Sequence, residues 1–311
     1  MRTPNFWKSK NLSAYLLYPF SLLYYFGYKL RIFFTKPYIS KIPVICIGNV
    51  VAGGAGKTPI AIEVGKILKS KKINFAYLSK GYSGCFEGVV KVDNKKHNAK
   101  FVGDEPLMLS EIADTYVCKN RKQGLQFLQN KKYKFIVVDD GLQNPSFYKN
   151  KSVLVVDSEY GVGNGFVLPA GPLREKLNYV LDRVDLIVVN NNKNKIKTEK
   201  PIVYTKLEVI NKNDFENKKV IAFAGIARPE KFFKTLEQIK CEIVKKVSFE
   251  DHYLYKDNDI EYLLRLAEKN KCNLVTTLKD WVRLSEKYKK VVKYVDIKIL
   301  FENKNLLEKL W

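Results

Sequence analysis

The sequence has little of what metal-binding and disulfide-stabilised proteins need. Its five cysteines are an odd number without a Cys-x-x-Cys pair, and its only histidines are His97 and His252. Zinc sites need clustered Cys and His ligands, so no zinc site is expected. Several cysteines, such as Cys46, lie inside apolar runs, which favours reduced, buried thiols in a cytosolic protein. A nucleotide-dependent metallochaperone is disfavoured, because it would need a metal-binding cluster.

Acidic residues are scarce relative to basic ones, with 32 Asp and Glu against 55 Lys and Arg, a net charge of +23. This charge predicts attraction to anionic partners: nucleic acid, anionic lipid or phosphorylated substrates. A compositional drift toward Lys and Asn, as in Asn190–Lys200, would explain the excess without any partner. No zinc-finger, RRM or helix-turn-helix pattern is present. We therefore expect no nucleic-acid partner, and no obligate protein partner is evident.

The N-terminal forty residues contain the longest uncharged run. It extends over 18 residues, Asn11–Tyr28, with basic residues on both sides, and it contains Pro19 and several tyrosines. This length is at the lower edge for a membrane span, and tyrosines favour the membrane interface. No small-residue cleavage site follows, which argues against a signal peptide. We predict that residues 1–40 form one or two interfacial helices, broken near Pro19. A soluble helical hairpin is the alternative.

The rest of the chain alternates apolar runs with helical stretches. Continuous Val/Ile runs separated by helices predict a parallel sheet with both faces covered, a doubly wound α/β fold. We expect a first domain over residues 41–210 and a smaller α/β domain over 211–311, with Asn190–Lys200 and Asn211–Lys219 as loop or linker. The predicted strands of the first domain are Pro43–Gly48, Asn74–Ser79, Thr115–Lys119, Lys134–Asp139, Ser152–Asp157 and Asp185–Asn190, and its helices are Thr58–Lys69, Glu105–Ala113 and Gly124–Gln129. The predicted elements of the second domain are the strands Val220–Gly225, Glu242–Ser248 and Asn273–Thr277 and the helices Pro229–Ile239 and Asp257–Glu268.

A glycine-rich turn follows the first of these strands and opens a helix. Its residues are Gly53, Gly54, Ala55, Gly56, Lys57 and Thr58. Glycines let backbone N–H groups converge on phosphate oxygens, and the helix N-terminus adds its positive dipole. Lys57 would reach the β- and γ-phosphates and Thr58 would hold Mg²⁺, as in P-loop NTPases. The first glycine of that motif is replaced by Val51.

A second apolar strand, Phe135–Asp139, ends in the carboxylates Asp139 and Asp140. Alone, such an ending is usually a turn, but beside a phosphate loop it predicts a Mg²⁺ site. GTP-binding proteins read the base with Asn-Lys-x-Asp after a late strand. Here the corresponding residues, Asn192–Lys195, end in Lys, which disfavours GTP.

Further motifs occur in a fixed order along nearly the whole chain. They are Gly48-Asn49, Gly53–Pro59, Ser79–Tyr82, Gly103–Pro106, Asp139–Gln143, Gly163–Gly165, Leu168–Glu175, Phe223–Ile226 with Pro229 and Phe232-Phe233, Asp251-His252, and Thr277 with Lys279-Asp280. Together they closely resemble the tetraacyldisaccharide 4′-kinase family of the lipid A pathway. The ordered set is far more specific than any single member.

The resemblance implies a two-domain α/β kinase with an N-terminal membrane-associating helix. Such an enzyme transfers the γ-phosphate of ATP to the 4′-hydroxyl of a tetraacylated glucosamine disaccharide 1-phosphate. It would act at the cytoplasmic face of the bacterial inner membrane, as a peripheral or monotopic protein. The alternative is another P-loop NTPase that binds nucleic acid or anionic lipid.

The resemblance also implies site residues. Asp104 corresponds to the family's catalytic carboxylate, working with His252. Judged on the residues alone, Asp104 would more simply cap a helix N-terminus, and an Asp-His pair could be an ordinary hydrogen bond. The other implied residues are Thr58, Asp139, Asp140 and Glu105 for Mg²⁺, and Arg174 and Asn164 for substrate or phosphate.

Three positions depart from the family's usual pattern. Asn144 replaces a His, Lys80 replaces an Arg, and Tyr253 follows His252 where a second His is common. Lys80 keeps the charge but loses the planar fork of a guanidinium. Asn144 leaves any proton-relay role of that position in question.

Overall fold

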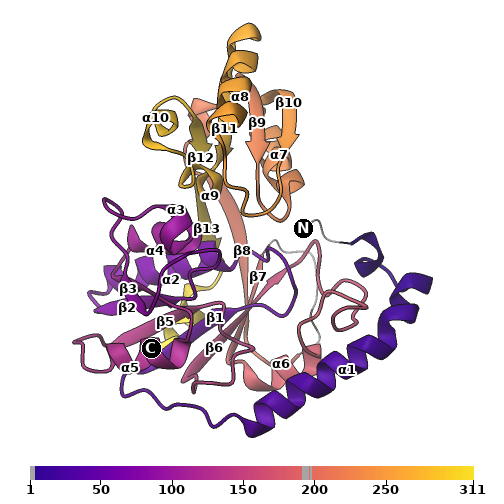
Figure 1. Cartoon of the computed structure of the whole chain (residues 1–311), viewed down its shortest axis with the longest axis vertical. Helices are drawn as coiled ribbons and strands as arrows, with labels where there is room; N and C mark the ends of the chain where they lie inside the picture. Colours follow the sequence, from indigo (N-terminus) through magenta and orange to yellow (C-terminus); the bar gives the residue numbers. More distant parts are fainter. Residues whose placement is uncertain (1–3, 191–195, 197) are drawn as a thin grey trace.

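The structure is a computed structural model that describes residues 4–190, 196 and 198–311. Figure 1 shows a large α/β body, a smaller α/β unit above it, and a long helix along the lower edge of the body. Within the described residues the body contains a nine-stranded sheet in the order β13-β8-β7-β6-β1-β5-β2-β4-β3. Its strands are β1 (Val44–Gly48), β2 (Phe75–Ser79), β3 (Val89–Lys91), β4 (Thr115–Cys118), β5 (Phe135–Asp139), β6 (Lys151–Asp157), β7 (Leu186–Asn190), β8 (Ile202–Val209) and β13 (Ile297–Phe301).

Helices cover both faces of this sheet, as a doubly wound fold requires. Alternate residues of β1 face opposite sides. Cys46 packs in one apolar core with helices α5 (Arg121–Leu128) and α6 (Leu177–Arg183), and Ile47 packs in the other with helix α2 (Lys57–Ser70). The central strands pair in parallel, and among the strands that the structure describes in this sheet only the edge pairs β3–β4 and β8–β13 are antiparallel. The helices of the body are α2 (Lys57–Ser70), α3 (Ala99–Val102), α4 (Asp104–Ser110), α5 (Arg121–Leu128), α6 (Leu177–Arg183) and α11 (Lys304–Leu307) with the 3-10 turn η3 (Glu308–Leu310).

The smaller unit is a second parallel sheet, in the order β10-β9-β11-β12, with helices on both faces. Helix α7 (Pro229–Gln238) contributes Phe232, Phe233 and Leu236 to one core, and helix α8 (Asp257–Lys269) contributes Ile260 and Leu263 to the other. Its elements are the 3-10 turn η2 (Lys212–Asp214), β9 (Lys219–Ala224), α7 (Pro229–Gln238), β10 (Glu242–Ser248), α8 (Asp257–Lys269), β11 (Asn273–Thr277), α9 (Leu278–Trp281), α10 (Glu286–Lys289) and β12 (Lys293–Val295).

The two units are joined by the antiparallel pair β8 and β13, which runs between them in Figure 1. The chain leaves the body along β8 and returns along β13. Phe301, Leu307 and Leu310 then pack in the core of the body beside α2. Residues 299–311, which we assigned to the second domain, therefore pack with the first one, whereas Ile297 at the start of β13 still packs against the core of the smaller unit.

The predicted strands and helices are confirmed, with every strand end within one residue and helix ends within three. The mostly parallel α/β fold with a second, smaller α/β unit is also confirmed. The elements that the sequence patterns did not indicate are β3, β8, β12, β13 and the short helices α3, α6, α9, α10 and α11. The predicted loop Asn190–Lys200 and the Asn192–Lys195 motif fall mostly outside the described residues.

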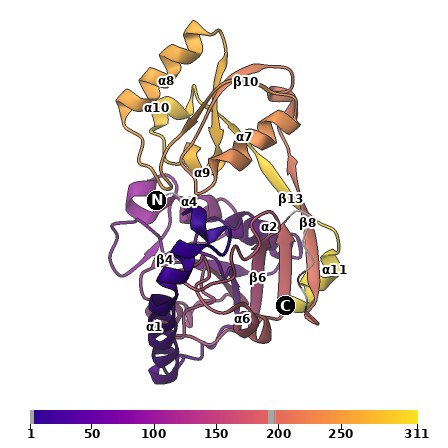
Figure 2. The ribbon, with the colours of Figure 1, turned by 90° about the vertical axis from the view of Figure 1, so that its right-hand side faces the viewer.

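The predicted break at Pro19 is wrong, because helix α1 is continuous over Leu12–Phe34. Asn11 caps it by accepting a hydrogen bond from the Ala14 N–H at 3.1 Å. Its buried residues, Ala14, Ser21 and Tyr28, are spaced seven apart on both sides of Pro19 and form one stripe against the body. This docking stabilises the helix across the missing N–H of proline. Figure 2 shows α1 running along the side of the body.

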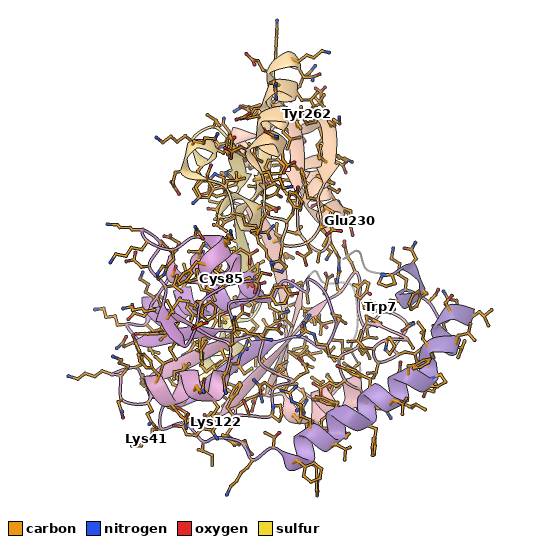
Figure 3. The ribbon with its side chains drawn as sticks, in the orientation of Figure 1. Trp7, Lys41, Cys85, Lys122, Glu230 and Tyr262 are labelled. Carbon is orange, nitrogen blue, oxygen red and sulfur yellow. The ribbon has the colours of Figure 1, made fainter. Side chains whose placement is uncertain are left out.

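The face of α1 opposite this stripe is apolar and exposed. Its exposed large apolar residues are Leu12, Leu16, Phe20, Leu22, Leu23, Phe26, Leu30, Phe33 and Phe34. Figure 3 shows side chains of α1 projecting away from the body. None of the helices in the described residues is both long and apolar enough to cross a membrane.

Candidate active site

The glycine-rich loop lies between β1 and α2, at the carboxyl edge of the parallel sheet. Gly53 and Gly56 have φ values of 106° and 76°, which glycine adopts readily. Gly56 directly precedes α2, so the loop ends at the positive end of a helix. A side chain at Gly56 would collide with the Asn190 amide, which donates a hydrogen bond to the Ala55 carbonyl at 2.9 Å. The loop therefore has the backbone geometry of an anion-binding turn, and Asn190 at the end of β7 holds it in this conformation.

Val51, which stands where P-loops usually have glycine, forms an antiparallel bridge with Leu173. It is 3% exposed and belongs to the core of the body. The Ala52 N–H also donates to the Pro172 carbonyl at 2.7 Å. The entry to the loop is thus extended backbone that any residue can adopt, and this explains why a valine fits there.

The ammonium of Lys57, the first residue of α2, lies at the centre of a polar cluster. It donates to Asn49 Oδ1 at 3.2 Å and lies 3.6 Å from Asp140 Oδ1. Arg174 donates to the same Asp140 oxygen at 2.9 Å. Burial raises the pKa of Asp140, but the charges of Lys57 and Arg174 outweigh it and hold the pKa at about 2. Asp140 is therefore ionised and orients two cations at the phosphate loop.

Asp139, the residue directly before Asp140, has a different environment. It is 2% exposed, its Oδ1 makes no hydrogen bond in the described residues, and its Oδ2 lies 3.4 Å from the Thr58 hydroxyl. Burial and the negative charge of Glu105 raise the pKa of Asp139 to about 7. A buried carboxylate without a cation is costly. This arrangement suits a bound cation next to Thr58.

Arg121 of α5 is a site residue that was not predicted from the sequence. Its buried guanidinium donates to the backbone carbonyls of Asp139 and Asp140 at 2.8 and 2.9 Å. Asp140 has a φ of 53°, in the left-handed region. Arg121 therefore fixes the turn that points the two carboxylates in different directions. No local signal in the sequence marks this arginine, because it lies 18 residues before Asp139 on another element.

Asp104 and His252 come from different domains and meet: His252 Nδ1 lies 3.1 Å from Asp104 Oδ2. Gly103, not Asp104, occupies the cap position of α4, and its neighbour Asp104 is the first helical residue, accepting from the Glu105 N–H at 2.9 Å. The simple capping interpretation therefore does not describe Asp104. The carboxylate is 4% exposed and reaches across to the second unit.

Two cations of the second unit complete this contact. Arg283, with 1% of its side chain exposed, donates from Nε to Asp104 Oδ2 at 2.8 Å, and its Nη2 lies 2.6 Å from the same oxygen. Lys279 donates to Glu105 Oε1 at 3.0 Å and lies 4.0 Å from Asp104 Oδ2. Burial raises the pKa of Asp104, but Lys279, His252 and Arg283 together lower it well below its usual range.

Arg283 was not among the site residues predicted from the sequence. Arg283 lies three residues after Asp280 of the Lys279-Asp280 motif, and both side chains bind the backbone of Gly225. Arg283 donates to Asp280 Oδ1 at 3.0 Å and to the Gly225 carbonyl at 2.8 Å, and the Gly225 N–H donates to Asp280 Oδ1 at 2.9 Å. The one sequence feature that could have indicated Arg283 is its spacing, because a basic residue three positions after the motif aspartate Asp280 can pair with it.

Asn164, predicted to contact substrate or phosphate, is 6% exposed and has its amide engaged. Its Nδ2 donates to the carbonyls of Phe6 and Ala170, at 3.1 and 2.9 Å, and its Oδ1 accepts from the Phe166 N–H at 3.0 Å. These bonds assign it to the loop beneath α1 and leave no free N–H for a substrate. Figure 3 places Trp7 in the same region, where its indole N–H donates to the Pro169 carbonyl.

Of the three residues that depart from the family pattern, Asn144 and Tyr253 make local hydrogen bonds and Lys80 is exposed. Asn144 accepts from the Ser146 N–H at 2.9 Å, which stabilises the turn after Asp139-Asp140. The Tyr253 hydroxyl donates to Asp259 at 3.0 Å, at the start of α8. Lys80 is exposed, beside the buried Ser79 that ends β2.

The doubly wound sheet, the glycine-rich loop at its carboxyl edge and the buried carboxylate beside Thr58 define a nucleotide-binding protein of the P-loop type. Comparison with known proteins is more specific. The profile of the family "Tetraacyldisaccharide-1-P 4'-kinase" (LpxK) matches residues 13–311. The chain therefore belongs to this family, and the expectation of an ATP-dependent lipid A 4′-kinase is confirmed.

Individual relatives agree with the family match. The tetraacyldisaccharide 4′-kinase of Rickettsia bellii is 38% identical over 309 residues, covering 98% of this chain and 96% of its own. That of Rhodospirillum rubrum is 38% identical over 320 residues, covering 100% and 97%. The crystal structure of LpxK from Aquifex aeolicus in complex with ATP has a TM-score of 0.79 at 26% identity, covering 96% and 98%. These findings favour the kinase over a nucleic-acid- or lipid-binding NTPase.

Proposed function

We propose that this chain transfers the γ-phosphate of ATP to the 4′-hydroxyl of a tetraacyl glucosamine disaccharide 1-phosphate, with Asp104 and His252 at the acceptor hydroxyl. The observation that carries the proposal is that the second domain meets the first both at the phosphate loop and at Asp104, whose carboxylate contacts His252 of the second domain. A Cβ atom on Gly54 would lie 3.3 Å from that of Ala227, so the second domain touches the loop itself.

The phosphate loop would bind the nucleotide's phosphates. Backbone N–H groups from Gly53 to Gly56 and the start of α2 supply hydrogen bonds and positive potential. Lys57 and Arg174 both form ion pairs with Asp140, and when ATP binds they would contact phosphate oxygens instead. In the transition state of phosphoryl transfer the charge spreads over the transferred oxygens and develops on the leaving oxygen of the nucleotide, so cations placed at these oxygens would stabilise the transition state more than the ground state.

Thr58 and Asp139 would hold Mg²⁺, with Asp140 and Glu105 nearby. The orphaned, buried oxygen of Asp139 and the hydroxyl of Thr58 are hard oxygen ligands of the kind that Mg²⁺ prefers. No cluster of three or more His, Cys, Asp or Glu with metal-binding geometry occurs in the described residues. Mg²⁺ at nucleotide sites needs only one or two carboxylates besides the substrate phosphates and water. When bound, Mg²⁺ would neutralise negative charge on the nucleotide's phosphates.

Asp104 would accept the proton of the attacking hydroxyl. Its Oδ2 contacts His252, whose other ring nitrogen lies 3.4 Å from the Lys279 ammonium. This arrangement orients the imidazole and keeps the carboxylate ionised and able to accept a hydrogen bond. In a loose phosphoryl-transfer transition state the hydroxyl loses its proton late, so a weak but well-placed base suffices.

The apolar face of α1 would place the enzyme on the cytoplasmic face of the inner membrane, where we expect the acylated substrate to lie. Leu16, Leu23 and Phe33 are 67%, 69% and 81% exposed, and basic residues flank the helix. An apolar face with basic flanks is typical of interfacial helices. We expect peripheral or monotopic binding.

The direct test incubates the purified full-length chain with γ-labelled ATP, Mg²⁺ and a tetraacyl disaccharide 1-phosphate in detergent micelles. The expected product is a labelled bisphosphate in which the new phosphate is on the 4′ position. An acceptor lacking the 4′-hydroxyl is the control and should remain unlabelled. Label that appears only as inorganic phosphate would refute the proposal.

A further inference from the structure

A buried polar side chain on the inner stripe of α1 makes a contact that the proposed mechanism does not use. Tyr28 is 9% exposed, and its hydroxyl donates to Glu175 Oε2 at 2.8 Å. Burial and Glu175 raise the pKa of Tyr28 far above its ordinary value, so the hydroxyl is a permanent donor. Glu175 is 0% exposed, and Arg183 pairs with the same oxygen and balances its charge.

The second oxygen of Glu175 leads toward the nucleotide site. Gln143, which follows the Asp139-Asp140 pair, donates one N–H to Glu175 Oε1 at 2.9 Å. It donates the other to the backbone carbonyl of Asn49, also at 2.9 Å. Both N–H groups of this amide are therefore committed, one to each neighbour.

Asn49 connects this bond to the phosphate loop. Its side chain is buried and donates to the carbonyls of Val51 and Gly53, at 2.9 and 3.4 Å. Its Oδ1 accepts from the Lys57 ammonium at 3.2 Å. One residue thus fixes the entry of the loop, its first glycine and its lysine.

We infer that the chain of hydrogen bonds Tyr28–Glu175–Gln143–Asn49, which runs through the buried side chains of Tyr28, Glu175 and Asn49 and the half-buried Gln143, ties the position of helix α1 to the geometry of the phosphate loop. Tyr28, Glu175 and Gln143 are then positioning residues for ATP, although Tyr28 lies on the helix that carries the exposed apolar face. The inference rests on the proposed function, because it assigns ATP to this loop. A helix displaced from its stripe breaks the first bond and leaves the next groups without partners.

The four groups are linked in a physical sense only if changes at the two ends are energetically coupled. A double-mutant cycle measures this directly. Tyr28→Phe removes the hydroxyl and keeps the ring, and Gln143→Leu removes the middle of the chain at similar volume. Tyr18→Phe removes a hydroxyl from the same helix that has no hydrogen bond in the described residues, so it serves as the control.

The experiment measures the dissociation constant of a non-hydrolysable ATP analogue with Mg²⁺ for the full-length protein and its variants by calorimetry. Tyr28→Phe and Gln143→Leu are each expected to weaken binding by about 2- to 30-fold. The double variant should be no weaker than Gln143→Leu alone, and Tyr18→Phe should match the wild type. In turnover assays, the loss should raise KM for ATP and leave KM for the acylated acceptor unchanged.

Additive losses, or a Tyr28→Phe protein with wild-type nucleotide affinity, would overturn the inference. A Tyr28→Phe protein that is unfolded at the assay temperature would make Tyr28 a folding residue and would also overturn it. A wild-type protein that binds no nucleotide would instead refute the proposed function, so the two failures are distinguishable.

Discussion

Arg283 is the residue whose replacement should most reveal how the two domains are joined. In Arg283→Met, the apolar stem is kept and the guanidinium is lost. That guanidinium contacts Asp104 through Nε and Nη2 and reaches the Gly225 carbonyl and Asp280 through Nη1. Its removal leaves the carboxylate of Asp104, which is 4% exposed, with fewer positive partners.

The magnitude follows from the burial of the pair. Breaking a buried ion pair by removing one partner costs about 3–5 kcal/mol. Asp104 keeps His252 at 3.1 Å and Lys279 at 4.0 Å, so the expected loss lies at the lower end, about 3 kcal/mol. Arg283→Lys should lose less, because it keeps the charge but not the planar fork.

The assay is urea unfolding, followed by far-UV circular dichroism for the whole chain and by tryptophan fluorescence. Trp281 lies two residues from Arg283 and reports on the second domain. The matched control is Arg265→Met, on the exposed surface of α8, which should change the free energy of unfolding by less than about 0.5 kcal/mol. If Arg283→Met were as stable as this control, the buried pair would not contribute to the joining of the domains.

Three further predictions concern nucleotide and membrane binding. Since the pKa of Asp139 is raised to about 7, a proton must leave as Mg²⁺ binds, so Mg·ATP affinity should fall about tenfold per pH unit below about 7. Asp139→Asn should flatten that profile in calorimetry, and an unchanged profile would exclude Asp139 as the titrating group. Lys57→Met should weaken ATP binding by about 10- to 150-fold, whereas Lys66→Met on the exposed side of α2 should not; equal effects would contradict the assigned role. Leu16→Asn with Leu23→Asn should lower co-sedimentation with anionic vesicles at least about tenfold and leave ATP binding intact; undiminished co-sedimentation would remove α1 as the membrane contact.

The phosphate loop could be predicted because its signal is local. The strand Val44–Gly48, the glycines, the lysine and the start of helix α2 at Lys57 follow one another directly in the sequence. The conformation of each depends on residues close to it in the chain. The parallel strands were predictable for a related reason. Strands such as Val44–Gly48 are buried on both faces, so their apolar runs are continuous and bounded by polar residues.

Contacts between distant parts of the chain were not predictable from composition or spacing. Asp104 and His252 are 148 residues apart, and only the resemblance to a kinase family brought them together. Edge strands were missed for a similar reason. The strand β13 pairs with β8, which lies far earlier in the sequence. Nothing in the five residues of β13 indicates this pairing.

The break expected at Pro19 shows how tertiary contacts override local propensity. A proline in a helix interior removes a hydrogen bond and costs about 3 kcal/mol. On the body side, Ser21 donates to the Val167 carbonyl at 2.7 Å and accepts from the Ala170 N–H at 3.0 Å, and Tyr28 binds Glu175. These contacts lie beyond the proline and keep the helix continuous, and they involve a loop that starts more than 140 residues later.

The most direct measurement of the central claim compares wild type with Asp104→Asn in single-turnover transfer of labelled γ-phosphate to the tetraacyl acceptor. ATP affinity is measured by calorimetry on the same samples. Asparagine keeps the shape of the side chain but cannot accept the proton, so transfer should fall by about 10²- to 10⁴-fold with ATP affinity within about twofold of wild type. Transfer at the wild-type rate by Asp104→Asn would show that the carboxylate between the two domains is not the base.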